Sequence, residues 1–266
     1  MIKITEINTY PVKSLKGYQS HTGILDDKGL QYDRNWMLVD SDGLFISQRE
    51  QPKMATIHVN IKNGQIGFSA SETEELVLHI DQKEQKKISV QVWDDVCEAN
   101  EVSITANDWF STYLGKACRL VKINADFRRI VDPTYTPFEA ITGFSDAYPF
   151  LLISEASLED LNTRLDTPVP MNRFRPNLVI SGTEAYAEDS WQRIRIGDVL
   201  FEVAKPCKRC VMTTIDQVSG QKGKEPLLTL SKYRKVNNKV LFGQNLVHHQ
   251  KGEIQVGMEV EIISVK

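Results

Sequence analysis

The sequence has little cysteine, no long hydrophobic run and no dominant sign of charge. Four cysteines among 266 residues are too few and too unevenly spaced for a secreted disulfide framework, so we expect a reducing, cytoplasmic environment. The longest unbroken apolar run extends from Ala147 to Ile153, far short of the roughly 20 residues that span a bilayer. The N-terminus lacks the pattern of a signal peptide. We therefore expect a soluble protein that is neither exported nor embedded in a membrane.

The charge balance and the missing motifs exclude several classes of function. Thirty-two basic and 35 acidic residues give a net charge of −3, so no overall positive field favours nucleic acid or an anionic membrane surface. No glycine-rich phosphate-binding or dinucleotide-binding fingerprint is present, and no serine lies in a nucleophile elbow. An anionic ligand would therefore need a local basic pocket.

Short runs of β-branched and aromatic residues, separated by Gly, Asn and Asp, predict strands along most of the chain. In the first third, the predicted strands are Ile2–Val12, Arg34–Val39, Leu44–Ser47, Thr56–Ile61, Leu76–Ile80 and Ile88–Trp93. In the second half they are Leu178–Ser181, Ile194–Ile196, Val199–Ala204 and Val211–Ile215, with a hairpin over Ile254–Ile262. The pair Asn63-Gly64 supplies the positive φ angles that a tight hairpin turn needs.

Three segments show helical spacing of apolar residues. They are Thr105–Leu114, which stops at Gly115, Ser154–Leu165, for which Ser154 is a suitable N-cap, and Pro226–Arg234. Residues 124–143 contain two prolines and few periodic apolar positions, which indicates a long connection near a domain boundary. The sequence therefore predicts a β-rich α+β protein of two β-dominated units that share an interface.

Cys207 and Cys210 enclose two cationic residues, Lys208 and Arg209. Three interpretations stay open for this pair: a zinc site, a redox-active dithiol, and two small buried residues. Zinc usually needs a second close pair of ligands, and the other two cysteines lie 21 positions apart. A dithiol of the thioredoxin type would be followed by a helix, whereas we expect a strand there. The cationic neighbours favour a thiolate, the form that attacks electrophiles or binds a soft metal.

Several other basic residues lie in loops beside Gly, Pro or Asn. The loops are Lys13–Gly17, Asp33–Asn35, Ser47–Arg49 and Asn172–Asn177. A single Lys or Arg is usually a solvated surface residue. Taken together, however, these loops resemble an anion cradle, because Arg offers forked donors to phosphate, Lys a point charge, and Ser and Asn further hydrogen bonds.

Six motifs in a fixed order carry a resemblance to a known family. They are Tyr10-Pro11-Val12-Lys13-Ser14, Asp33-Arg34, Phe144-Ser145-Asp146, Phe174-Arg175-Pro176-Asn177, Tyr186 to Trp191, and Cys207-Lys208-Arg209-Cys210. The chain resembles the MOSC family, in the branch of the mitochondrial amidoxime reducing component and its bacterial relatives. The resemblance implies an N-terminal β-barrel-like partner domain over residues 1–120 and a MOSC-type β-barrel domain over residues 121–266.

The resemblance also implies a molybdenum cofactor, in which a pterin dithiolene with a phosphate holds the metal and one protein cysteine binds it. By its place in the motif that cysteine is Cys210. The residues carried over as contacts of the pterin and its phosphate are Lys13, Ser14, Arg34, Arg175, Asn177, Lys208 and Arg209. Two positions depart from the family pattern: Lys208 stands where a serine can occur, and Ala147-Tyr148 replaces small hydroxyl residues, so contacts there would use backbone groups or the Tyr148 hydroxyl.

The activity implied by the resemblance is the reduction of N-hydroxylated compounds such as amidoximes, hydroxylamines or hydroxylated purines. Electrons would come from a separate haem, flavin or iron-sulfur protein, because the chain shows no ferredoxin domain, and neither nucleic acid nor a membrane is expected as a partner. Asp146 is a candidate for proton handling or substrate orientation, with a structural cap as the alternative. The rival function is that of a stand-alone carrier of the cofactor or of sulfur.

Overall fold

The largest sheet of the molecule belongs to the C-terminal half but includes the first strand of the chain. This computed structural model describes residues 1–81 and 86–266. The strand order is β2-β1-β15-β14-β19-β17-β16-β21, and β18 also pairs with β19. The strands are β1 (Lys3–Thr9), β2 (Tyr18–Ser20), β14 (Phe150–Ser154), β15 (Leu178–Ser181), β16 (Trp191–Ile196), β17 (Val199–Lys208), β18 (Lys235–Val236), β19 (Lys239–His248) and β21 (Val260–Val265). The pair β14–β15 is parallel, with helix α2 (Glu155–Asn162) in the connection between the two strands.

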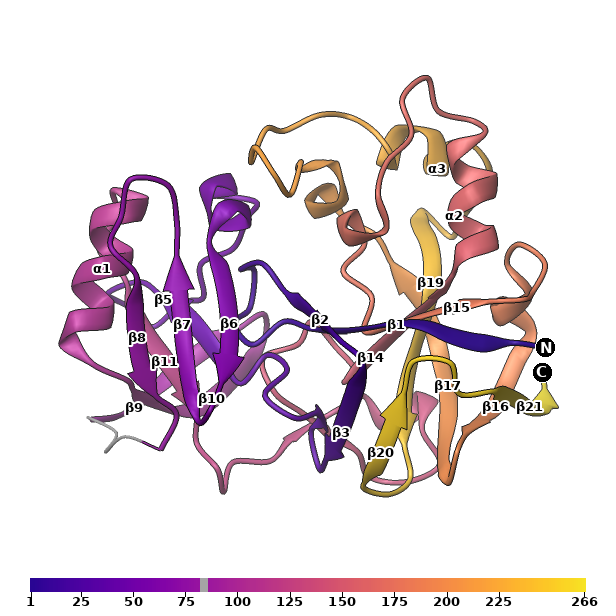
Figure 1. The fold of residues 1–266 in the computed structure, drawn as a ribbon, viewed down its shortest axis with the longest axis horizontal. Helices are drawn as coiled ribbons and strands as arrows, with labels where there is room; N and C mark the ends of the chain where they lie inside the picture. The colour runs from indigo at the N-terminus through magenta and orange to yellow at the C-terminus, as the bar shows by residue number, and fades with distance from the viewer. Residues whose placement is uncertain (82–85) are drawn as a thin grey trace.

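The N-terminal half forms a second lobe with sheets of its own (Figure 1). One sheet has the order β5-β11-β10-β9 and another the order β6-β7-β8. The strands are β5 (Trp36–Val39), β6 (His58–Lys62), β7 (Gln65–Ser69), β8 (Leu76–His79), β9 (Lys87–Val92), β10 (Asp95–Glu101) and β11 (Arg119–Ile123). Helix α1 (Ile104–Leu114) packs beside them, and Phe110 of this helix lies in the same hydrophobic core as Phe68.

Several short elements complete the fold, and Leu25, Leu30 and Ile254 of one small sheet lie in the same hydrophobic core as Phe150. Strand β3 (Thr22–Asp26) pairs with β4 (Gly29–Leu30) and with β20 (Gly252–Gln255), which lies near the other end of the chain. Strands β12 (Arg129–Ile130) and β13 (Ile141–Thr142) pair with each other. The remaining elements are helix α3 (Leu227–Tyr233) and the 3₁₀ turns η1 (Pro52–Thr56), η2 (Pro133–Tyr135), η3 (Met171–Arg173), η4 (Ala187–Ser190) and η5 (Val211–Thr214).

Each lobe has its own hydrophobic core. Trp36 and Phe110 are buried in the first, and Phe150 and Phe201 in the second. The structure thus confirms the predicted β-rich α+β class. The division at residue 120 stays a prediction, since β1 pairs with β15 and β3 with β20. Within the described residues, no helix is long and apolar enough to cross a membrane.

Several local predictions are confirmed by the backbone. Helix α1 begins after Ser103, whose side chain accepts a hydrogen bond from the Ala106 amide, and it ends at Gly115 in the left-handed region. Helix α2 is capped by Ser154, as the sequence indicates. The Asn63-Gly64 turn joins β6 to β7, with φ angles of 51° and 71°.

Three local predictions are wrong. The predicted strand Leu44–Ser47 does not form, and this segment makes only isolated bridges, Leu44 with Gln91 and Phe45 with Val39. Residues Val211–Thr214 form the 3₁₀ turn η5 and not a strand, because the hydroxyls of Thr213 and Thr214 donate to carbonyls three residues back, at Cys210 and Val211. The C-terminal segment 254–262 is not a hairpin either: β20 pairs with β3, and β21 pairs with β16. Its alternating pattern is that of two strands that join different sheets.

Candidate functional site

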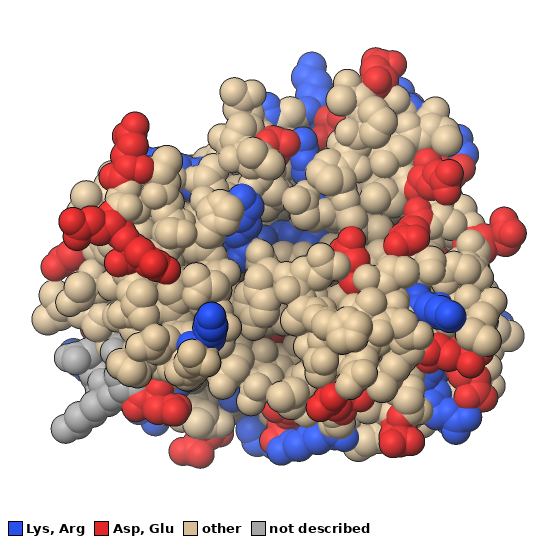
Figure 2. Space-filling view, in the orientation of Figure 1, with Lys and Arg blue, Asp and Glu red and all other residues tan. Residues whose placement is uncertain are grey.

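A cavity of about 870 Å³ lies between the two lobes and is lined by both. Figure 2 shows a hollow between the lobes in which Lys and Arg side chains gather, whereas acidic side chains are frequent along the outer edges. All eleven site residues predicted from the sequence lie on the wall of this cavity, namely Lys13, Ser14, Arg34, Asp146, Ala147, Tyr148, Arg175, Asn177, Lys208, Arg209 and Cys210. The volume is in the range of pockets for small molecules and cofactors. The roles of these residues stay predictions.

Two arginines from different lobes enclose one tyrosine ring. The guanidinium carbons of Arg34 and Arg175 lie 4.4 Å and 4.2 Å from the ring centroid of Tyr10. Arg175 donates to the Leu15 carbonyl, and burial, followed by the nearby Arg34, lowers the pKa of Arg175 to about 10. Both arginines have positive φ angles, 50° for Arg34 and 55° for Arg175, a conformation that costs free energy at residues other than glycine. The fold therefore holds two cations close together at the cavity wall.

Arg34 is only partly available to a ligand. It donates to the carboxylate of Asp33, which is buried, and to the side-chain carbonyl of Asn177 at 3.0 Å. Burial raises the pKa of Asp33, and the pair with Arg34 opposes that rise. The remaining donors of Arg34 can face the cavity.

Asn177 joins three strands at the back of the cavity. Its side-chain carbonyl accepts from the Leu151 amide at 3.2 Å, and its amide group donates to the Asn8 carbonyl at 3.1 Å. Its side chain is therefore largely engaged within the protein. Tyr148 likewise donates its hydroxyl to the Asp132 carbonyl at 3.3 Å. The polar groups of Asn177 and Tyr148 are thus mainly used within the protein, and both side chains contribute to the shape of the cavity wall.

Lys13 and Asp146 form an ion pair across the two lobes. Lys13 Nζ donates to Asp146 Oδ1 at 2.6 Å and to the Phe144 carbonyl at 2.9 Å. Trp93 Nε1 donates to the same carboxylate oxygen at 3.2 Å. Desolvation in the cavity raises the pKa of Asp146, but the charge and the hydrogen bond of Lys13 outweigh it, so this pKa lies well below its usual value. Asp146 is therefore ionised at neutral pH.

The two cysteines of the Cys207–Cys210 motif differ in their surroundings. Arg209 Nη1 lies 2.9 Å from the Cys207 sulfur, and Arg209 Nη2 donates to the Phe174 carbonyl at 2.7 Å. Cys210 is exposed at the start of η5 and also lines the cavity. Both cysteines line the cavity, but Cys207 is half-buried and paired with a protein cation, whereas Cys210 is exposed.

Metal ligands contributed by the protein alone are sparse. In residues 1–81 and 86–266, no group of three or more His, Cys, Asp or Glu side chains could hold a metal ion. The zinc interpretation of the Cys207–Cys210 pair thus finds no ligand set in this part of the chain. A metal at Cys210 would need ligands from a bound group.

The cavity residues missed by sequence reasoning include Trp93, Arg129, Asp132 and Lys205. Arg129 is buried, bonded to Asp95 at 2.7 Å and to backbone carbonyls of the 143–145 segment. Trp93 has a φ angle of 56°, unusual for a bulky residue, in the turn between β9 and β10. The turn at Trp93-Asp94, between two predicted β segments, is the one sequence signal that could have pointed to Trp93. The places of Arg129, Asp132 and Lys205 on the cavity wall depend on contacts between distant segments.

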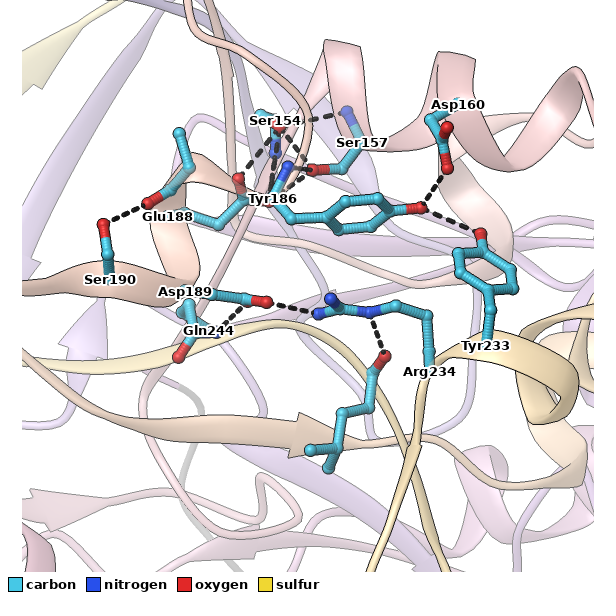
Figure 3. A network of polar contacts seen from close by, with 12 residues as sticks. Ser154, Ser157, Asp160, Tyr186, Glu188, Asp189, Ser190, Tyr233, Arg234 and Gln244 are labelled. Atoms are coloured by element: carbon cyan, nitrogen blue, oxygen red, sulfur yellow. Dashed lines mark hydrogen bonds and ion pairs between the residues drawn. The ribbon is translucent and has the colours of Figure 1, made fainter.

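A second polar network includes residues of the Tyr186 to Trp191 motif (Figure 3). These residues do not line the cavity. Glu188 is buried and accepts hydrogen bonds from Ser154 and from Ser157 Oγ, the latter at 2.8 Å. Asp189 accepts from Arg234 and from Gln244. This motif therefore links the start of α2, the end of α3 and strand β19.

The fold and the cavity agree with the comparisons with known proteins. The family model described as "MOSC domain" matches residues 140–261, and the one described as "MOSC N-terminal beta barrel domain" matches residues 1–117. The chain belongs to the MOSC family, in the group that includes the amidoxime-reducing components.

Two relatives stand for this similarity. The mitochondrial amidoxime-reducing component 1 of Mus musculus is 33% identical over 98% of this chain and 82% of the relative. The molybdenum cofactor sulfurase of Oryza sativa subsp. japonica is 36% identical over 91% of this chain, which spans 32% of that relative. Among solved structures, the YUAD protein from Bacillus subtilis aligns over 98% of this chain and 95% of its own with a TM-score of 0.45 and 10% identity. The chain is thus a relative of proteins of molybdenum cofactor chemistry.

Proposed function

We propose that this protein holds a molybdenum cofactor in the cavity between its lobes and reduces N-hydroxylated compounds. The observation that carries the proposal is the composition of the cavity wall, which combines basic side chains from both lobes with the exposed thiol of Cys210. Amidoximes, hydroxylamines and hydroxylated purines are the proposed substrates. The similarity to amidoxime-reducing components supports this choice.

The donors of the wall fit an anionic cofactor. The buried Nε atoms of Arg173 and Arg209 have no hydrogen-bond partner among the described residues. Unpaired buried donors are unfavourable unless a ligand or water satisfies them. Lys13, Ser14 and Arg34 from the first lobe, with Arg175, Asn177, Lys208 and Arg209 from the second, are the proposed contacts of the pterin and its phosphate. Phosphate suits these forked and point-like cations.

When bound, the cofactor would supply a two-electron redox centre that takes the oxygen of the substrate. Cys210 would contribute the protein ligand to the metal, since a thiolate suits a soft metal. Overall, the N–O bond of the substrate breaks, two electrons and two protons enter, and the products are the reduced nitrogen compound and water.

Asp146 is proposed to orient the substrate and not to donate a proton. Its carboxylate is ionised and held by Lys13 and Trp93, both through Oδ1. Oδ2 can therefore accept a hydrogen bond from a hydroxyl or N–H group of the substrate. The backbone of Ala147 and the ring of Tyr148 border the same place on the wall.

The electrons are proposed to come from a separate haem, flavin or iron-sulfur protein. A cytoplasmic location and a role in detoxifying N-hydroxylated compounds belong to the same proposal. All four cysteines are unpaired, which fits a reducing compartment.

The test is to purify the protein from a host that makes molybdenum cofactor and to compare wild type, Cys210→Ser and Cys207→Ser. We expect near one molybdenum per chain in wild type and in Cys207→Ser, and loss of amidoxime reduction in Cys210→Ser. Absence of molybdenum and pterin from folded wild type would refute the proposal. A stand-alone carrier function is the second candidate, supported by the similarity to a cofactor sulfurase. It wins when the wild type holds molybdenum but a chemical reductant drives no turnover.

A further inference from the structure

The segment that contains the Cys207–Cys210 motif is strongly basic in a protein of slightly negative charge. Residues 205–239 include nine Lys or Arg residues and two Asp or Glu residues, a net charge of +7, whereas the whole chain carries −3. The rest of the chain therefore carries −10. Such an asymmetry produces a local field that attracts an acidic partner.

Three lysines of this segment lie on neighbouring strands, and one of them, Lys208, lines the cavity. Lys208 ends β17, Lys239 begins the neighbouring strand β19, and Lys235 lies on β18, which pairs with β19. Lys208 pairs across the two strands with Leu241, two positions from Lys239, so the two lysines lie close together. Among the described residues, no ion pair with a carboxylate is recorded for any of the three. The protein thus keeps their charges uncompensated.

Exposed apolar side chains accompany the lysines. Val211 directly follows Cys210 and is 52% exposed, and Val236 on β18 is 54% exposed. We call Lys208, Lys235, Lys239, Val211 and Val236 the basic rim. Lysines that steer encounter beside apolar groups that can be buried are typical of a protein interface. A nucleic acid would need a longer row of phosphate contacts than these three lysines offer.

We propose that the basic rim is the docking surface for the electron donor, a carrier protein whose redox centre lies beneath an acidic face. This inference rests on the proposed function, because that reaction consumes two electrons that must come from outside the chain. The rim adjoins the exposed Cys210, so a docked carrier would stand next to the proposed metal ligand. The donor is oxidised by two electrons in total while the substrate gains them together with two protons.

The test uses the cofactor-loaded protein with three purified acidic carriers: a cytochrome b5, a [2Fe–2S] ferredoxin and a flavodoxin. The variant is Lys235→Gln/Lys239→Gln, which removes two charges of the rim without placing a carboxylate beside Lys208, the rim residue that is also a proposed cofactor contact. Lys62→Gln is the matched control, since Lys62 is also an exposed lysine at a hairpin but lies in the other lobe. Turnover with reduced methyl viologen measures the reaction without a protein donor.

At low ionic strength we expect at least a tenfold loss of carrier-supported turnover in the double variant, with viologen-supported turnover unchanged. Salt should slow the wild type with the carrier and reduce the difference between the two proteins, because it screens exposed charges. The proposal is overturned when the double variant stays within twofold of wild type, or when Lys62→Gln loses as much.

Binding measured by calorimetry separates this inference from the proposed function. We expect at least one carrier to bind the wild type at low ionic strength, and the double variant to bind it at least tenfold more weakly. A wild type that reduces no substrate even with viologen refutes the proposed function, while the binding result still stands. Binding of anionic phospholipid vesicles through the rim, with no carrier bound, would assign the surface to a membrane and overturn the inference.

Discussion

Lys13 and Asp146 lie 133 positions apart in the sequence and form an ion pair on the cavity wall. This pair keeps both side chains charged. Lys13 is buried, whereas the side chain of Asp146 is 63% exposed. Desolvation lowers the pKa of Lys13, but the adjacent carboxylate opposes that effect. The carboxylate of Asp146 therefore favours the protonated form of Lys13, and the ammonium group of Lys13 favours the ionised form of Asp146. The same pair explains why Asp146 is suited to orienting a substrate and poorly suited to acting as an acid.

The pH dependence of stability in Asp146→Asn tests this ion pair. The pKa of Asp146 is lowered by folding, so the carboxylate contributes its full stability above its unfolded value of about 3.9, and this contribution is lost as the pH falls toward the folded value. We expect the variant to lose less than about 1 kcal/mol near neutral pH, because the carboxylate is largely exposed. The deficit should begin to shrink below about pH 4 and should keep shrinking as the pH falls further toward the folded pKa.

Urea unfolding of both proteins over this pH range gives the measurement. Asp42→Asn, at an exposed aspartate in the other lobe, serves as the control and should show no such deficit. The acid limb of the kcat/KM profile should stay in place in Asp146→Asn. Movement of that limb would assign Asp146 a role in proton transfer and contradict the orienting role.

Among the elements, α2 depends on a buried acid that comes from a different segment. Glu188 of η4 accepts hydrogen bonds from the backbone and side chain of Ser154 and from the side chain of Ser157. Ser154 is also the N-cap of α2. A carboxylate near a helix N-terminus is favourable as well, because of the helix dipole.

Replacement of this acid should be costly. We expect Glu188→Ala to lower the free energy of unfolding by about 2–4 kcal/mol, because several buried hydroxyl and amide groups would lose their acceptor. Denaturant unfolding provides the measurement. Glu184→Ala, at an exposed position four residues before Glu188, is the control and should change the free energy of unfolding by less than about 0.5 kcal/mol. Equal losses in both variants would show that the network contributes little.

The comparison of sequence and structure is also best made element by element. Helix α1 and the β6–β7 hairpin were predictable because their signals are local: a serine cap, a terminal glycine and an Asn-Gly turn. Strands β3 and β20 were not, since each is stabilised by the other across more than 200 residues. The turn η5 was mistaken for a strand because two threonines, favourable in strands, instead bond to their own backbone.

The candidate site follows the same division. The loops with Lys13, Arg34 and Arg175 could be assembled from the sequence because basic residues beside Gly, Pro and Asn stand out, and the family motifs order them. The sequence could not predict how many hydrogen-bonding groups of each side chain are already used within the protein and how many remain for a ligand. Arg34 donates to the carboxylate of Asp33, and the Asn177 side chain is hydrogen-bonded to the backbone of two other strands. Those partners become known only when the lobes are in contact.

At the scale of the whole molecule, the cavity wall is shared between lobes whose cations repel one another. A bound anionic cofactor would remove this repulsion and contact both lobes at once. Ligand that binds the folded state at 1,000 times its dissociation constant stabilises it by about 4 kcal/mol. We expect the cofactor-loaded protein to melt about 10 °C above the cofactor-free protein.

Differential scanning calorimetry of the two forms measures this shift. In Arg175→Ala the cofactor-free form should be the less affected of the two, and the gain from loading should shrink. A melting temperature that does not respond to cofactor would mean that the group is not held between the lobes.

The pairing of β1 with β15 and of β3 with β20 has a consequence for synthesis on the ribosome. Strands β1 and β3 can pair early with their neighbours β2 and β4, but their second partners, Leu178–Ser181 and Gly252–Gln255, are translated much later. The sheets from β5 to β11 can form much earlier, since their partners lie within one hundred residues of chain. Nascent chains that stall before residue 252 would leave β3 paired with β4 but without its second partner β20, so the sheet that joins the two ends of the chain is completed last.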